Sequence, residues 1–216
     1  MKIFDRKGVC YNELSGPEIE KKSFEIIQSE LGLTPYKKDE LPIVIRVIHA
    51  TADFDFSKIM AFHGQAVKNG LASIKKGRSI LTDVNMVASG ISTVLCNRYG
   101  IDVLTPIGTQ ECAELAAQKG ITRAAAAMEI GRKQGDVGIV AVGNAPTALL
   151  HLFDLIEQGL MMPDLIVGVP VGFVNAAESK EILSSQDKVP FITAKGRKGG
   201  SPVAAAIINA MLRMAK

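Results

Sequence analysis

His49 is the side chain in this sequence best suited to acid–base chemistry, because imidazole titrates near neutral pH. It directly follows an apolar run, residues 43–48, whose composition predicts a β-strand. In a parallel α/β protein, ligands bind where a strand gives way to its loop. His49 is therefore placed to meet a ligand, although a histidine at this position can also serve only to cap the strand through a hydrogen bond.

Two later strand-like runs also end on residues that could contact a ligand. The run at 79–83 ends on Asp83, which either caps the next helix or contributes a carboxylate to a site. The run at 137–142 continues into Gly143 and Asn144, where a tight turn, an expected N-cap at Asn144 and a proline in the first helical turn follow. The backbone N–H groups of such a turn are expected to be open to an anion or a carbonyl, although an ordinary strand-to-helix turn has the same sequence.

Residues 195–202 (KGRKGGSP) form the most basic loop of the chain. Lys195, Arg197 and Lys198 lie beside three glycines at the start of a helix. Cations and free backbone N–H groups at a helix start favour a bound anion. The loop lacks the spacing of a Walker A sequence, and the chain has no GxGxxG, so nucleotide binding is weakly supported.

Arg123 and Ser23 each allow two interpretations. Thr122 is expected to cap a helix that begins with Arg123, where the helix dipole disfavours a cation unless an anion docks there. A solvent-exposed arginine is equally consistent with that position. Ser23 lies on the apolar side of a predicted helix at 17–31, where its hydroxyl either bonds back to the preceding turn or points into a polar site.

The alternation of strands and helices predicts a three-layer α/β/α fold with a doubly wound, mostly parallel sheet of five to six strands. The chain is expected to form a single domain over 1–216, with 1–16 as an irregular lead-in. All strand-end loops of such a sheet come out at one edge. This edge is expected to bring together His49, Asp83, Asn144, Gly172, Lys195, Arg197 and Lys198. Strands are expected at 43–48, 79–83, 102–106, 137–142, 165–169 and 189–194, and helices at 17–31, 56–76, 84–97, 109–118, from 122, after 143, at 176–183 and from 203.

Composition excludes several classes of protein. Hydrophobic residues make up 47% of the chain and charged residues 22%, which is typical of a globular protein. A net charge of +3 is too small to indicate nucleic-acid binding. The three cysteines form no CxxC pair, which favours reduced thiols in a cytoplasmic protein and argues against a metal site. No apolar run reaches the roughly 18 residues that span a membrane.

Taken together, the motifs resemble the precorrin-8X methylmutases of cobalamin biosynthesis, which include cobalt-precorrin-8 methylmutase. The resemblance runs from Pro17 to the C-terminus, and it is specific because separate blocks occur in the family's order. These blocks are residues 22–24 (KSF), 46–49 (RVIH) with 51–55 (TADFD), 120–123 (GITR), 143–149 (GNAPTAL), 168–174 (GVPVGFV) with 177–181 (AESKE), and 196–201 (GRKGGS).

The resemblance implies an isomerase that moves a methyl group from C11 to C12 of a contracted tetrapyrrole, giving cobyrinic or hydrogenobyrinic acid. It implies that His49 is catalytic and that Ser23 and Arg123 contact the substrate. It further implies a homodimer and no cofactor, because the methyl group moves within one molecule and any cobalt arrives inside the substrate. The block at 51–55 is more similar to the cobalt-dependent branch. The expected substrate-binding residues are Ser23, Arg46, Thr82, Asp83, Arg123, Gly143, Asn144, Lys195, Arg197 and Lys198.

Two other functions use the same edge of the sheet. One is a non-catalytic protein that binds a corrinoid or another anionic metabolite. The other is a phosphate-ester hydrolase or nucleotide-binding module, against which the missing phosphate-loop motifs count. A binding protein would tolerate His49→Ala with little loss beyond affinity, whereas a mutase would keep binding and lose turnover.

Overall fold

The computed structural model describes residues 14–215 and divides the chain into two units, 1–35 and 36–216. The described part of the first unit contains α1 (Gly16–Leu31), which agrees with the predicted helix. The backbone N–H and the hydroxyl of Ser15 each donate to the Glu18 carboxylate at 2.7 Å, which secures the helix start. Most of the predicted lead-in lies outside the described residues, and the prediction of one domain stays a prediction.

The second unit contains a six-stranded sheet with the order β1-β6-β5-β4-β2-β3. Neighbouring strands are parallel except β1, which pairs antiparallel with β6 at one edge. The predicted doubly wound, mostly parallel sheet is therefore confirmed. The strands are β1 (Met60–Phe62), β2 (Ser79–Thr82), β3 (Val103–Leu104), β4 (Val137–Val142), β5 (Leu165–Gly168) and β6 (Phe191–Ala194).

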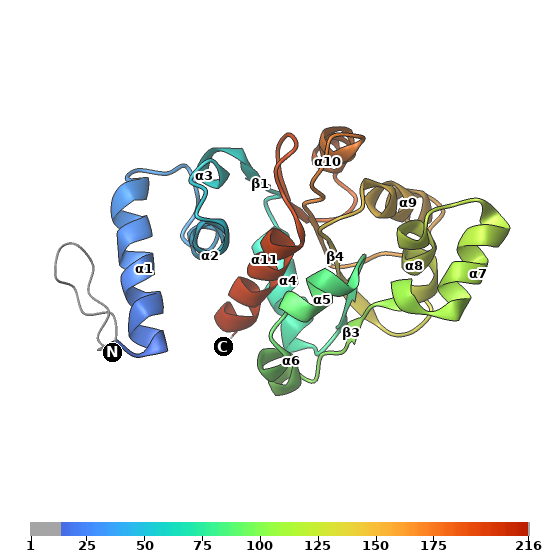
Figure 1. The fold of residues 1–216 in the computed structure, drawn as a ribbon, viewed down its shortest axis with the longest axis horizontal. Helices are drawn as coiled ribbons and strands as arrows, with labels where there is room; N and C mark the ends of the chain where they lie inside the picture. Colours follow the sequence, from blue (N-terminus) through green and yellow to red (C-terminus); the bar gives the residue numbers. More distant parts are fainter. Residues whose placement is uncertain (1–13, 216) are drawn as a thin grey trace, which may run out of the picture. The chain divides into compact units, whose positions relative to one another are not determined.

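Helices cover both faces of the sheet, which makes three layers (Figure 1). The central strands β4 and β5 are buried along their whole length, as their continuous apolar sequences require. One face is covered by α2 (Leu41–Thr51), α4 (Ala66–Lys75), α5 (Asn85–Gly90), α6 (Thr93–Tyr99) and α11 (Ser201–Met214), and the other by α7 (Gln110–Lys119), α8 (Arg123–Gly131), α9 (Pro146–Glu157) and α10 (Ala176–Ser185).

The strand predicted at 43–48 is wrong, because these residues form the middle of α2. Five of its residues are buried (Ile43, Val44, Ile45, Val47 and Ile48), and α2 packs along α11. A short run of buried apolar residues fits a fully buried helix as well as a central strand. The β-branched side chains favoured the wrong alternative, since tertiary burial overrides their weak strand preference.

Two predicted helices are interrupted in the structure. Residues 56–76 form α3 (Phe56–Ile59), then the edge strand β1, and only then α4. Residues 84–97 form α5 and α6, which are separated where Ser92 begins a new helix and its hydroxyl accepts from Leu95 N. The remaining strands and helices lie within about two residues of their predicted positions.

Candidate active site

The carboxyl ends of the parallel strands meet at one edge of the sheet. Asp83 follows β2, Asn144 follows β4, Gly172 follows β5 and Lys195 follows β6. These four residues were predicted to share an edge, and the strand order confirms it for this group. The edge is therefore the place in the second unit where a ligand site is expected.

His49 reaches this region from a helix and not from a strand. It lies in the last turn of α2 and is exposed, while the helix ends at Ala52, whose φ is 53°. A non-glycine residue in this left-handed conformation turns the chain sharply out of the helix. Arg46 lies one turn earlier in α2 and is half-buried.

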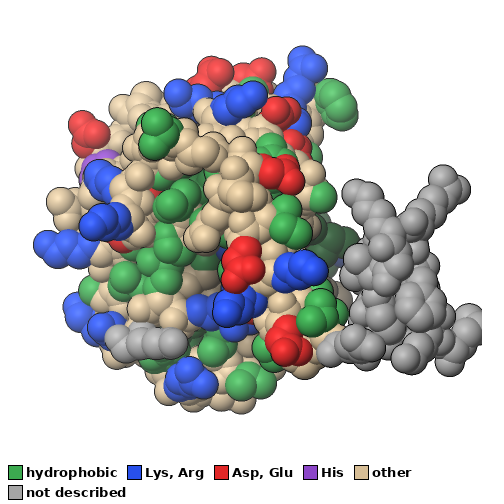
Figure 2. All heavy atoms as spheres, turned by 90° about the vertical axis from the view of Figure 1, so that its left-hand side faces the viewer, with side chains coloured by type: hydrophobic (Ala, Val, Ile, Leu, Met, Phe, Trp, Pro, Cys, Tyr) green, Lys and Arg blue, Asp and Glu red, His purple; other side chains and the backbone are tan. Residues whose placement is uncertain are grey.

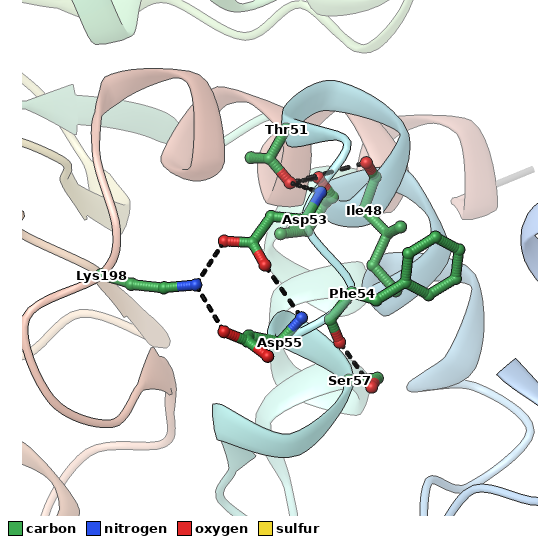
Figure 3. A network of polar contacts seen from close by, with 8 residues as sticks. Ile48, Thr51, Asp53, Phe54, Asp55, Ser57 and Lys198 are labelled. Carbon is green, nitrogen blue, oxygen red and sulfur yellow. Dashed lines mark hydrogen bonds and ion pairs between the residues drawn. The ribbon is translucent and has the colours of Figure 1, made fainter.

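Lys198 joins the turn after α2 to the loop after β6 (Figure 3). Its Nζ lies 2.7 Å from Asp53 Oδ2 and 2.6 Å from Asp55 Oδ2. The hydrogen bond from Lys198 holds the pKa of Asp53 below its ordinary value, and the two carboxylates raise the pKa of Lys198. Asp53 also stabilises the turn, because its Oδ1 accepts from Asp55 N at 2.9 Å. Asp55 is at the N-cap position of α3, but its side chain makes no capping bond to that helix.

The basic loop, residues 195–200, is fastened to the neighbouring loops through its backbone. Lys195 N donates to Ile59 O at 2.8 Å, and Gly200 N donates to Val169 O at 2.9 Å. A Cβ at Gly199 would lie 2.2 Å from the same carbonyl oxygen of Val169, so only glycine fits there. The backbone of this loop is thus held, while the side chains of Lys195 and Arg197 are exposed.

Arg197 has an aromatic neighbour from the loop after β5. Its guanidinium carbon lies 5.5 Å from the ring centre of Phe173, a cation–π distance. Phe173 is 83% exposed, and Val174 beside it is 77% exposed. Arg197 therefore presents a cation next to apolar surface, a combination that suits a ligand with carboxylates on an apolar ring.

Lys180 is a buried residue in contact with the basic loop that the sequence analysis did not single out. It lies in α10, is 1% exposed, and its Nζ donates to Lys198 O at 2.7 Å. Burial lowers its pKa to about 8. Its spacing from Ala176 and Leu183 was the available signal, because these three positions share one helix face, which is buried here.

Asp83 is fully buried and occupies the N–H groups of the loop after β4. Its carboxylate accepts from Gly143 N at 3.0 Å and from Asn144 N and Ala145 N at 2.8 Å each. Burial raises its pKa, and these three hydrogen bonds oppose that rise. The expectation that these N–H groups are open to a ligand is therefore wrong. Ala145, not Asn144, is the N-cap of α9.

The other predicted contact residues occupy different surroundings. Thr82 is fully buried, and its hydroxyl lies 2.7 Å from that of Thr105. Arg123 is exposed at the start of α8, where the predicted cap is confirmed because Thr122 Oγ1 accepts from Ala125 N. The hydroxyls of Thr122 and Thr147 lie 2.8 Å apart, so the starts of α8 and α9 adjoin. Ser23 lies in the middle of α1, in the first unit.

Charges of both signs occur on the face shown in Figure 2, where Asp and Glu side chains lie among Lys and Arg. Within residues 14–215, no three His, Cys, Asp or Glu side chains are grouped as metal ligands would be. In the same part of the chain, no helix is long and apolar enough to cross a membrane.

The fold is that of an α/β protein with a mostly parallel sheet, in which exposed cations lie on the loop that follows β6 and an exposed histidine lies at the end of α2. A family model described as precorrin-8X methylmutase matches residues 18–214. The chain belongs to the precorrin-8X methylmutase family. It is thus an isomerase of cobalamin biosynthesis that moves a methyl group within one molecule.

Individual relatives agree with this assignment. The chain is 45% identical to a cobalt-precorrin-8 methylmutase from Priestia megaterium, over 90% of this chain and 86% of the relative. It is 36% identical to a precorrin-8X methylmutase from Sinorhizobium, over 92% and 94%. A crystal structure of precorrin-8X methylmutase from Thermus thermophilus is similar with a TM-score of 0.85 at 40% identity, covering 93% of this chain and 96% of that one.

Proposed function

We propose that this chain converts cobalt-precorrin-8 to cobyrinic acid by moving a methyl group from C11 to C12, with His49 as general acid. The observation that carries the proposal is the exposed position of His49 at the end of α2, next to a turn that Lys198 holds against the basic loop. The greater identity to the cobalt-precorrin relative supports the cobalt-containing substrate.

In the proposed mechanism, the His49 imidazolium donates a proton or a hydrogen bond to a nitrogen of the macrocycle. Electron density then leaves the conjugated ring, which eases breaking of the C11–methyl bond as the C12–methyl bond forms. The proton returns to His49 after the shift, so the atoms balance within one substrate molecule. General acid assistance of this kind contributes roughly 10²–10⁴-fold to a rate.

The exposed cations are proposed to bind the carboxylate side chains of the substrate. Arg197 and Lys195 extend from the basic loop, and Arg123 from the start of α8. Arginine can bind a carboxylate with two parallel hydrogen bonds, which fixes orientation as well as affinity. Ser23 and Arg46 are proposed to add contacts, whereas the buried Thr82 and Asp83 would support the loops from behind.

No added cofactor is needed in this proposal, because donor and acceptor carbons belong to one molecule and cobalt is part of the substrate.

We also propose a cytoplasmic homodimer. The buried free thiols of Cys96 and Cys112 support a reducing compartment. Light scattering of the purified protein measures its molar mass in solution. A monomer at all concentrations would contradict the proposed dimer.

The test of function is the absorption spectrum of the protein mixed anaerobically with cobalt-precorrin-8. Wild type is expected to shift the spectrum to that of cobyrinic acid, and His49→Ala to bind substrate but turn it over roughly 10²–10⁴-fold more slowly. His63→Asn is the matched control, because it also removes an imidazole but from a different segment of the chain. His63 lies between β1 and α4, with its ring 5.8 Å from that of Phe191. If wild type binds without converting, the metal-free substrate is tried next, and failure on both would leave a binding protein.

A further inference from the structure

Lys180 is a buried cation that the proposed reaction leaves without a role. Its side chain is among the largest fully buried ones of the described residues. Removing an ammonium group from water is costly unless strong partners compensate, and burial lowers the pKa of Lys180 to about 8. An apolar residue of similar length would fill the same space with a smaller desolvation free energy. The presence of an ammonium group here therefore indicates that its charge or its hydrogen bond has a role.

The acceptor of its hydrogen bond is the backbone of the basic loop. Lys180 Nζ lies 2.7 Å from the carbonyl oxygen of Lys198. Beside this bond is a hollow of about 270 Å³, lined by Lys180, Lys195 and Gly196 among others. The hydrogen bond from Lys180 therefore joins α10 to the loop next to a space that side chains do not fill.

Lys198 carries the connection across the loop. Its carbonyl accepts from Lys180, while its own ammonium group binds Asp53 and Asp55 in the turn that follows α2. The exposed His49 lies in the last turn of that helix. One residue thus links the buried face of α10 to the end of the helix that carries the proposed general acid.

We propose that Lys180 is a positioning residue: by binding the carbonyl of Lys198 it holds the basic loop and, through the side chain of Lys198, the turn that follows His49. This inference rests on the proposed function. It assigns to α10 a part in turnover although Lys180 does not touch the reacting atoms. In Figure 1, the loop between β6 and α11 runs between α10 and α3, the short helix that follows the turn bound by Lys198.

A lysine that only stabilises the fold would behave differently from a positioning residue. Lys180→Met keeps the length and removes the buried charge, so thermal stability at pH 7 is expected to stay equal to wild type or to rise. The loop, in contrast, loses its hydrogen bond. Loop order and turnover are then expected to fall while stability does not, which a purely structural role would not produce.

The experiment compares wild type, Lys180→Met, Lys180→Gln and the control Lys188→Met, using full-length protein and cobalt-precorrin-8. Lys188 is an exposed lysine paired with Glu157, outside the proposed site. Four quantities are measured: kcat, KM, the rate of hydrogen exchange of the amides in residues 195–200, and the temperature of thermal unfolding. Lys180→Met should exchange faster in this loop and lose up to about 100-fold in kcat/KM, with kcat falling as well as KM rising. Lys180→Gln, which keeps an N–H donor, should recover part of both losses.

The outcomes separate the two proposals. Wild type without turnover on either substrate overturns the proposed function. Active wild type with Lys180→Met unchanged in kcat and in loop exchange overturns the positioning role. If both Lys180 variants fail to fold, or lose turnover only in proportion to lost stability, Lys180 is structural and the inference is equally wrong.

Discussion

His49 and Lys180 differ in how far their roles could be inferred from sequence. The histidine was selected by residue type, and its catalytic role stays a prediction, while the strand predicted to carry it is a helix. For Lys180, the sequence offered only its helical spacing from Ala176 and Leu183. Its burial depends on how α10 packs beside β6, and its acceptor is a backbone carbonyl 18 positions away, which no side-chain pattern reveals.

The buried charge of Lys180 makes stability depend on pH in a defined direction. Its pKa is about 8 in the folded protein and 10.5 ordinarily, so the unfolded chain binds more protons between these values. The free energy of unfolding contributed by Lys180 therefore rises as pH increases from about 8 to about 10.5. Relative to Lys180→Met, wild type should gain on the order of 2–3 kcal/mol across this window.

Urea unfolding of both proteins at pH 7.5, 9 and 10.5 or thereabouts measures this difference, and other lysines cancel in the comparison. A difference that stayed constant with pH would mean that Lys180 keeps its ordinary pKa in the fold.

At the scale of elements, loops and buried helices were harder to predict than strands. The central strands β4 and β5 were located closely because continuous apolar runs are typical of buried parallel strands. The same property misled the interpretation of α2, which is buried against α11. The predicted cap at Thr122 is confirmed, since its side chain accepts a hydrogen bond from its own helix.

The basic loop should not tolerate a side chain at Gly199. Gly199→Ala would bring a Cβ to 2.2 Å from Val169 O, so the loop must shift away from β5. We expect a loss of about 1–3 kcal/mol in stability and a rise in KM, because Arg197 and Lys195 move with the loop.

Gly64→Ala is the control, since an added Cβ there meets nothing within 4 Å. Thermal unfolding and steady-state kinetics provide the two measurements. A Gly199→Ala protein with wild-type KM would show that the loop position does not matter for substrate binding.

For the whole molecule, alternation of strands and helices was enough to predict the sheet and the edge where its loops gather. It did not predict the antiparallel β1, because three residues inside a helix-like segment carry too little pattern. The alternation of strands and helices also does not distinguish exposed residues at this edge from buried ones such as Asp83.

The net charge of +3 gives a test of how the whole molecule attracts its substrate. Charges of both signs are mixed on the face in Figure 2, so long-range attraction is modest and the local cations should dominate. Raising ionic strength shortens the screening length from about 10 Å at 0.1 M to about 3 Å at 1 M. We expect KM for the carboxylate-rich substrate to rise severalfold and kcat to change little. A KM independent of salt would argue against binding through exposed cations.

The hydrogen bonds of Asp83 also affect which anions can bind at this edge of the sheet. In nucleotide-binding α/β proteins, the turn between a central strand and its helix offers its N–H groups to a phosphate. Here a carboxylate of the chain itself already neutralises that turn through Gly143, Asn144 and Ala145. A phosphate would have to displace a buried anion of like charge, so the protein carries a built-in competitor against nucleotides. We therefore expect an anionic ligand to be bound by exposed cations such as Lys195 and Arg197, and not by the turn after β4, which would favour a ligand with widely spaced carboxylates.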